Sequence, residues 1–439
     1  MSLEGELAEA REKVERCARD FGLDFSRVIF ELLDWNEINV IASYGGFPSR
    51  YPHWRFGMEF EQMSKSYRYG LQKIYEMVIN NDPCYAYLLR SNNMIDQKMV
   101  MAHVFGHADF FRNNVYFAQT NRKMIDEMGN HRAKIQRYVN RFGFDPVESF
   151  VDRCLSIENL IDIHHPMKGV RRHERRKSLL KGEITDELRK PAEPEQAFKV
   201  ERDVLLFLIE NAPLEPWERD VLSILREEAC YFAPQGQTKI LNEGWAAFWH
   251  SRIMTTKILN DSEVIDYASH HAATVSPSPG KLNPYKIGME LLRDIERRFG
   301  TEKIFTVRRV HNDLTFLDEF LTEDFCQEQK MFTYGFNQAN GTYEIVDRDH
   351  KKVKEKLLAS LTNLGSPIIQ VSDGNYASRG ELALKHLHEG VDIRLDWMKE
   401  VMKNLFGLWR HPVHLETLVE GVPKLFSFEG EECKEQRLT

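Results

Sequence analysis

The chain has 439 residues, a formal net charge of −8, 42% hydrophobic and 29% charged residues, enough apolar material for roughly three packed domains. The negative charge argues against a general nucleic-acid binder, and no apolar run approaches the ~20 residues of a membrane span. The amino terminus is charged from its start, unlike a secretory signal, and the 6 cysteines are scattered, as is typical of reduced thiols. We therefore expect a globular cytoplasmic protein.

The first half of the chain is predicted to be mainly helical. Residues 44–57 are rich in Gly, Pro and aromatic side chains and hardly suit regular structure. From about 58 to 163 the apolar spacing predicts successive helices, including one over 66–79 and a long one over 93–118. Residues 166–200 are charged and contain several prolines, which indicates a solvated insertion or linker. A docking site for an acidic partner is the functional alternative for that segment.

The second half changes from helical to mixed periodicity. Helices are predicted over 201–260, and Asn340-Gly341 between two apolar runs predicts a β-hairpin. Further on, the pattern predicts a helix over 352–363, a strand over 367–371, two helices within 380–407 and a strand over 413–419.

We expect an α+β fold with a mainly helical N-terminal and central body and a small C-terminal α+β domain. The expected divisions are 1–165, the charged segment 166–200, a helical region 201–280 that completes a site with the first, and a C-terminal domain 281–439.

The segment Met101–Phe111 carries two histidines four residues apart. On a helix, His103 and His107 project from one face, which is how metal-binding helices present two imidazoles to one ion. Asp96 falls in the same sector and could hold these ligands in place by hydrogen bonding, whereas Asp109 lies roughly opposite. The alternative is a buried histidine pair satisfied by neighbouring carbonyl groups.

A second helical segment, Leu241–His250, offers a carboxylate. Burying Glu243 among Trp and Phe residues is costly unless it is paired, protonated or bound to metal. His103, His107 and Glu243 together make the three-protein-ligand set of a catalytic zinc with an open fourth position, although another divalent metal would fit. His250 could ligate as well or hold a ligand by a hydrogen bond. The alternative for Glu243 is an ion pair with an arginine.

A short stretch resembles a known metallopeptidase group. Leu241-Asn-Glu-Gly-Trp-Ala246 is similar to the signature that carries the glutamate zinc ligand in gluzincin aminopeptidases. His103-Val-Phe-Gly-His107 would then stand where that group has H-E-x-x-H. Val104 occupies the place of the catalytic glutamate, so the usual general base is missing at this position.

A broader resemblance covers nearly the whole chain. Four stretches resemble the SpoVR family (stage V sporulation protein R): Tyr44–Glu59, Tyr75–Tyr87, Met101–His107 and Lys239–Ala246. The resemblance implies a cytoplasmic bacterial protein linked to spore cortex formation, with relatives in non-sporulating bacteria. It also implies a PrkA-type serine kinase and a von Willebrand A-domain protein as possible partners. It implies no particular reaction.

Other residues could complete a hydrolytic site. Glu228 is a candidate general base or fourth metal ligand, and otherwise a surface or ion-paired carboxylate. His271, or its neighbour His270, could donate to a developing oxyanion, or could be an ordinary helix-terminal histidine.

The 44–57 stretch sets cationic groups among aromatic rings. Arg50, His53 and Arg55 could bind a carboxylate or a sugar-peptide substrate. Alternatively, the stretch is a structural plug in which the aromatics fill a groove and the arginines pair with acids.

Two functional hypotheses follow. The first is a zinc-dependent, metallopeptidase-like hydrolase of an amide bond in a peptide or peptidoglycan precursor, serving spore cortex formation or stress physiology. The second is a non-catalytic regulatory protein that works with the kinase and the von Willebrand A-domain protein. A redox or di-metal oxygenase is a less favoured third class.

Overall fold

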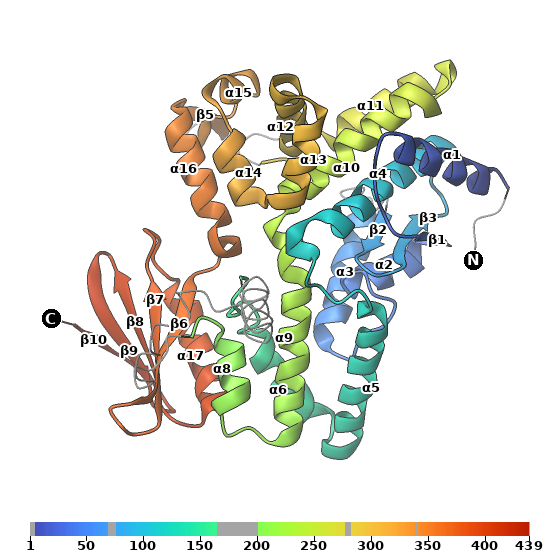
Figure 1. The fold of residues 1–439 in the computed structure, drawn as a ribbon. Helices are drawn as coiled ribbons and strands as arrows, with labels where there is room; N and C mark the ends of the chain where they lie inside the picture. The colour runs from blue at the N-terminus through green and yellow to red at the C-terminus, as the bar shows by residue number, and fades with distance from the viewer. Residues whose placement is uncertain (1–4, 69–75, 165–200, 277–281, 339–340, 439) are drawn as a thin grey trace, which may run out of the picture. The chain divides into compact units, whose positions relative to one another are not determined.

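The computed structural model describes residues 5–68, 76–164, 201–276, 282–338 and 341–438. The chain forms two compact units: one contains residues 1–134 and 234–364, the other residues 135–233 and 365–439. Helices predominate and several small sheets accompany them (Figure 1). This confirms the expected α+β class with a helical body. The charged segment 166–200 lies outside the described residues.

The first unit contains a small mixed sheet that the sequence pattern did not predict. Its strand order is β1 (Val28–Leu33), β3 (Cys84–Leu89), β2 (Glu76–Ile79), with β1 parallel and β2 antiparallel to β3. The expectation of successive helices from about 58 to 163 is therefore wrong where β2 and β3 lie. The helix expected over 66–79 is also wrong at its end, because residues 76–79 form β2. Short apolar runs are ambiguous between helix and strand, and here pairing with β3 decides.

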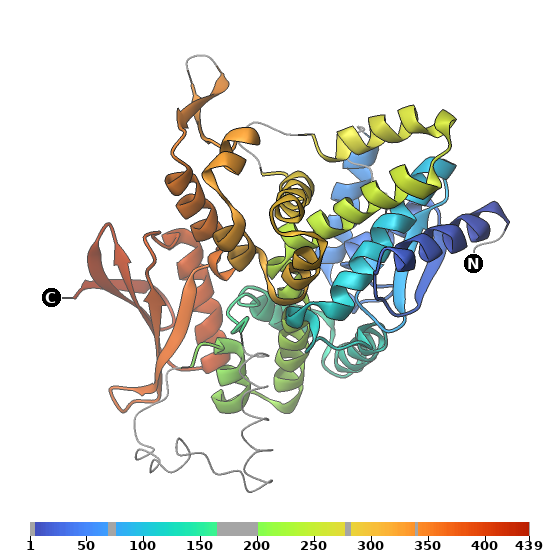
Figure 2. The same cartoon turned by 45° about the horizontal axis from the view of Figure 1, so that its top comes forward.

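Two long buried helices form the centre of the first unit. In α4 (Met94–Asn113) every residue from Met99 to Phe111 is buried, and most of α10 (Lys239–Ile253) is buried too. The two helices run side by side (Figure 2). α4 is shorter than the helix expected over 93–118, because it ends at Asn113 and Asn114 caps its C-terminus. The Asn114 side chain donates to the carbonyls of Arg308 and His311 and caps a 3₁₀ turn, Val115–Phe117.

Glycines allow the central helices to cross closely. A β-carbon on Gly106 of α4 would lie 2.7 Å from the Cα of Ala246 on α10. On the other side of α10, a β-carbon on Gly244 would lie 2.4 Å from Gly288 of α12 (Pro284–Phe299). Small residues at such crossings bring backbones, and hence the side chains beside them, unusually close.

The first unit also contains the following helical elements: α1 (Glu6–Asp20), α2 (Trp35–Ser43), α3 (Trp54–Arg68), η3 (Met254–Ile258), η4 (Asp261–Glu263), α11 (Val264–Thr274), α13 (Thr301–Val310), α14 (Asp313–Phe320), α15 (Glu323–Glu328) and α16 (His350–Leu361). The short η5 (Thr362–Gly365) ends with a residue of the second unit. The strands β4 (Thr333–Asn337) and β5 (Thr342–Asp347) pair antiparallel, which confirms the predicted hairpin, although Asn340 itself lies outside the described residues. The helix expected over 352–363 corresponds to α16.

The second unit contains a five-stranded sheet with the order β10-β9-β8-β7-β6. Its strands are β6 (Ile368–Tyr376), β7 (Glu381–Leu387), β8 (Val413–Val419), β9 (Val422–Phe428) and β10 (Cys433–Arg437). α17 (Leu395–Trp409) packs against β8 and β9 (Figure 1). Its other helical elements are α6 (Phe144–Leu155) and α8 (Val204–Asn211), while α5 (Met124–Phe142) and α9 (Pro216–Gln237) include residues of both units.

The predicted strands over 367–371 and 413–419 are present as β6 and β8, but the expectation of two helices within 380–407 is wrong. Residues 381–387 form β7, and only α17 is helical there. Residues 381–387 are rich in Leu, Ala, Lys and Glu, which favour helix. β7 nevertheless pairs antiparallel with β6 and parallel with β8, so long-range pairing overrides the local preference.

No helix within the described part of the chain is long and apolar enough to span a bilayer.

Candidate metal centre

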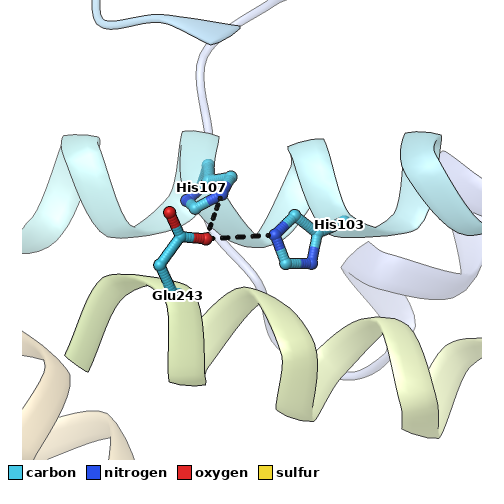
Figure 3. A group of neighbouring side chains, drawn as sticks. All are labelled: His103, His107 and Glu243. Atoms are coloured by element: carbon cyan, nitrogen blue, oxygen red, sulfur yellow. Dashed lines mark ion pairs between the residues drawn. The ribbon is translucent and has the colours of Figure 1, made fainter. Parts of the chain in front are cut away.

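Three predicted ligands meet between α4 and α10. His103 Nε2 lies 3.5 Å and His107 Nε2 lies 3.4 Å from the same carboxylate oxygen, Glu243 Oε2 (Figure 3). The ligand atoms of these three residues all lie within 4.8 Å of one another. Both imidazoles are buried. The convergence expected from the two helical segments is thus present in the structure.

Local helix geometry and close packing together produce this cluster. His103 and His107 are one helical turn apart and project from the same face of α4. Between them, Gly106 lets the backbone of α4 approach Ala246 of α10. Glu243 lies almost one turn before Ala246 on α10, close to the point where the two helices cross. Its side chain is therefore long enough to bring the carboxylate to both imidazole rings (Figure 3).

The second ring nitrogen of each histidine has a defined partner. His107 Nδ1 lies 2.9 Å from Asn242 Oδ1, and His103 Nδ1 lies 2.9 Å from His250 Nδ1. Because an amide oxygen only accepts hydrogen bonds, His107 carries a proton on Nδ1, and its Nε2 faces Glu243. Such an outward hydrogen bond from Nδ1 is the usual way to orient a metal-binding imidazole.

Glu243 is held as a carboxylate. Burial alone would raise its pKa, but the neighbouring His103 and His107 outweigh burial and hold the pKa well below its ordinary value. Among the described residues, Glu243 Oε2 is buried and makes no hydrogen bond. A charged, buried oxygen without a hydrogen bond is costly, and a cation at the meeting point of the three side chains would remove that cost.

Two buried aspartates support the surrounding helices. Asp313 accepts hydrogen bonds from the backbone amides of Ile240 and Leu241, each at 2.8 Å, at the start of α10. Asp109 accepts from Trp245 Nε1 at 2.8 Å, on the side of α4 opposite the two histidines, as its position in the helix predicts. Burial raises the pKa of both carboxyl groups to about 7.

The other histidines near α4 contact His103, Asp96 or one another. His250 bonds to His103, as described above, rather than to Glu243. Its other nitrogen, Nε2, lies 3.0 Å from His271 Nδ1. Asp96 Oδ1 lies 2.5 Å from His270 Nδ1, and the role of Asp96 in holding the ligands stays a prediction. Burial lowers the pKa of His250 well below its ordinary value and also lowers that of His271.

The proposed substrate-binding residues contact neighbouring residues of the stretch, and Arg50 also donates to Met128 Sδ of α5 at 3.0 Å. The Arg50 guanidinium lies over the rings of Tyr51 and Phe56, and Arg55 pairs with Glu59 at 3.0 Å. His53 is buried, and its Nδ1 accepts from the backbone amide of Arg55. These contacts resemble the structural plug more than an open binding surface, and the substrate-binding role stays a prediction.

Glu228 is buried on α9, in the second unit. The described residues that could together hold a metal ion are His103, His107 and Glu243. Glu228 as base or fourth ligand therefore stays a prediction.

Two residues of the site's surroundings were not predicted from the sequence. Asn242 orients His107, and its position directly before Glu243 could have suggested it. The ring of Tyr285, on the first turn of α12, lies 5.9 Å from that of His103. No local pattern links Tyr285 to the histidines, because 182 positions separate it from His103.

The fold and the His/His/Glu cluster define a mainly helical protein with a candidate metal centre, and the chain belongs to the SpoVR family. The family model described as SpoVR like protein matches residues 3–366, and the model described as SpoVR-like C-terminal domain matches residues 367–420. The predicted family is thereby confirmed.

A curated relative is the uncharacterized protein YcgB of Escherichia coli (strain K12). It is 27% identical to this chain over 467 aligned positions, which cover 92% of this chain and 90% of YcgB. No solved structure matches the chain significantly.

Proposed function

We propose that this protein binds a divalent metal ion, zinc in the first instance, at His103, His107 and Glu243. We propose further that it uses the ion to hydrolyse an amide bond in a peptide or peptidoglycan precursor. The convergence of two Nε2 atoms on one buried carboxylate oxygen carries the proposal. A cytoplasmic location and a role in spore cortex formation or stress physiology belong to the same proposal.

The spacing of the ligand atoms supports a metal. Distances of 3.4 and 3.5 Å exceed the ~2.7–3.2 Å of ordinary hydrogen bonds. Two ligand atoms at about 2.0–2.1 Å from a tetrahedral zinc are about 3.3 Å apart. Each imidazole nitrogen is therefore spaced from the carboxylate oxygen more like a neighbouring ligand of one ion than like a hydrogen-bond partner.

The chemistry divides between the ion and the chain. When bound, a divalent metal lowers the pKa of a coordinated water and polarises a carbonyl group. Asn242 and His250 hold the two imidazoles with their Nε2 atoms toward the centre. Val104, fully buried on α4, offers no proton acceptor where the gluzincin group has a glutamate. Glu228 is our candidate for that role.

Metal analysis of the purified protein tests the proposal. We expect about one equivalent of zinc after preparation without chelator, and loss of that metal in His103→Ala and Glu243→Ala. Asp109→Asn serves as a matched control, since Asp109 is buried on the same helix but accepts its hydrogen bond from Trp245. A wild-type protein that remains metal-free when supplied with Zn²⁺, Mn²⁺ or Fe²⁺ would contradict the proposal.

The absent glutamate at position 104 favours a second candidate function, a regulatory protein with a structural metal or histidine cluster. Its partners would be a PrkA-type kinase and a von Willebrand A-domain protein. Co-purification with these two proteins tests this alternative. It is supported if deleting residues 166–200 abolishes binding while His103→Ala does not, and rejected if the full chain binds neither protein.

A further inference from the structure

Three imidazoles from three helices form a hydrogen-bonded chain that begins at a proposed metal ligand. His103 on α4 contacts His250 on α10 through two Nδ1 atoms 2.9 Å apart. His250 Nε2 then lies 3.0 Å from Nδ1 of His271 on α11. His250 is 2% exposed, whereas His271 is partly exposed. The hydrogen-bonded series of imidazoles thus runs from the buried cluster toward the surface of the first unit.

The positions of the ring protons in these three imidazoles depend on one another. To bind a metal through Nε2, His103 must carry its proton on Nδ1 and donate it to His250 Nδ1. A neutral His250 then carries its own proton on Nε2 and donates it to His271 Nδ1. His271 must therefore accept at Nδ1. If His271 donated from Nδ1 instead, both inner rings would have to change tautomer and His103 Nε2 would become protonated.

We infer that His271 is a positioning residue for the metal centre, acting through His250 to hold His103 in its metal-binding tautomer. The inference rests on the metal binding proposed above. It gives His271 a role different from the oxyanion donor considered from the sequence, because the Nδ1 atom is already engaged with His250.

The packing of α11 makes this contact important for the helix that carries it. Tyr267 is its buried residue, and its ring stacks on His271 with centroids 5.6 Å apart. Val264 and Ile265 remain 48% and 77% exposed. Polar contacts from two adjacent histidines therefore fasten α11: His271 to His250, and His270 to Asp96 at 2.5 Å.

This arrangement supplies a matched control. His270→Ala removes a contact of the same helix with a different buried partner, Asp96 of α4, and leaves the His271–His250 contact in place. We expect His271→Ala to weaken Zn²⁺ affinity about 10–100-fold, as is usual when the hydrogen-bond partner of a ligand is lost. We expect His270→Ala to change affinity less than about threefold. Competition with a chromophoric chelator measures both, and circular dichroism verifies that both variants are folded.

Replacements that keep or invert the hydrogen bond sharpen the test. In His271→Gln the amide oxygen can accept from His250, whereas in His271→Lys the ammonium group only donates. We expect the affinity to fall in the order wild type, Gln, Ala, Lys. The visible absorption of the Co²⁺-substituted protein should change in the same order, since it reports the geometry of the ligands rather than the stability of the fold.

Failure of this inference is distinguishable from failure of the proposed function. If the wild type binds Zn²⁺ but His271→Ala and His270→Ala are equally affected, α11 acts only by docking and the inference is overturned. If His271→Lys binds as tightly as the wild type, the inference is likewise overturned. If the wild type binds no metal, the proposed centre itself is rejected.

Discussion

Gly106 of α4 packs directly on Ala246 of α10, so closely that a β-carbon on Gly106 would lie 2.7 Å from the Ala246 Cα. This contact lies between the two histidines of α4 and beside the carboxylate of α10. It sets the helix separation at which His103, His107 and Glu243 share a common point (Figure 3). The lack of a side chain on Gly106 is thus required for the site, just as the three ligands are.

The Gly106→Ala substitution should therefore disrupt both packing and metal binding. The new methyl group meets backbone atoms, which cannot turn away, so α4 and α10 must separate. We expect a loss of about 1–3 kcal/mol in the free energy of unfolding, typical of overpacked cores, and at least tenfold weaker Zn²⁺ binding. Urea denaturation and metal titration measure the two effects.

Gly129→Ala is the control for this substitution. Gly129 also lies within a helix, α5, but outside the adjacent residues and the backbone of that helix no atom lies within 4 Å of the position of its β-carbon. Here the gain in helix propensity should raise stability by up to about 1 kcal/mol. Equal effects of the two substitutions would show that the close crossing of α4 and α10 is unimportant.

Replacing Asn242 should affect metal binding through His107. Asn242→Ala removes the acceptor 2.9 Å from His107 Nδ1, which frees the imidazole to rotate and change tautomer. We expect Zn²⁺ affinity to fall about 10–100-fold. Asn242→Asp retains an acceptor at the same place and should bind within a few-fold of the wild type. Isothermal titration calorimetry compares them; the same affinity in all three proteins would contradict an orienting role.

The stability conferred by Asp313 should depend on pH. Burial raises its pKa from 3.8 to about 7, although the amides of Ile240 and Leu241 favour the carboxylate. The folded chain then holds a proton that the unfolded chain releases near pH 4. The stability of the wild type relative to Asp313→Asn should therefore be highest below about pH 4, fall as the pH rises to about 7, and level off above it.

Urea denaturation of both proteins at several pH values measures this difference. The free energy of unfolding of the wild type relative to Asp313→Asn should fall by at most about 4 kcal/mol. This corresponds to about 1.4 kcal/mol for each pH unit between the pKa of Asp313 in the unfolded and in the folded chain. Because Asp313→Asn lacks only this carboxyl group, the comparison cancels the titration of other groups. A difference that rises with pH would mean that the two backbone amides outweigh burial.

The thiol of Cys84 should be unreactive in the folded protein. It is buried on β3, and burial raises its pKa to about 12, so very little thiolate forms at pH 8. Cys433, which is partly exposed on β10, should react with iodoacetamide much faster. Mass spectrometry of peptides labelled before and after denaturation measures both rates. Rapid labelling of Cys84 in the native state would show that the small sheet opens readily.

The sequence by itself determined those features that depend on neighbouring positions along the chain. The four-residue spacing of His103 and His107 placed both rings on one helix face. Asn340-Gly341 indicated the hairpin of β4 and β5, and four long stretches indicated the SpoVR family. These inferences need only the period of a helix, the turn preference of an Asn-Gly pair or a match of residues.

Only the tertiary structure decided features that depend on partners distant in the chain. Residues 76–79 and 381–387 have side chains compatible with a helix, yet pairing with neighbouring strands makes them β2 and β7. The partner of each imidazole likewise lies more than 130 positions away. Such contacts are set by how helices and sheets pack, because the free energy of burial and pairing outweighs the small preferences of local sequence.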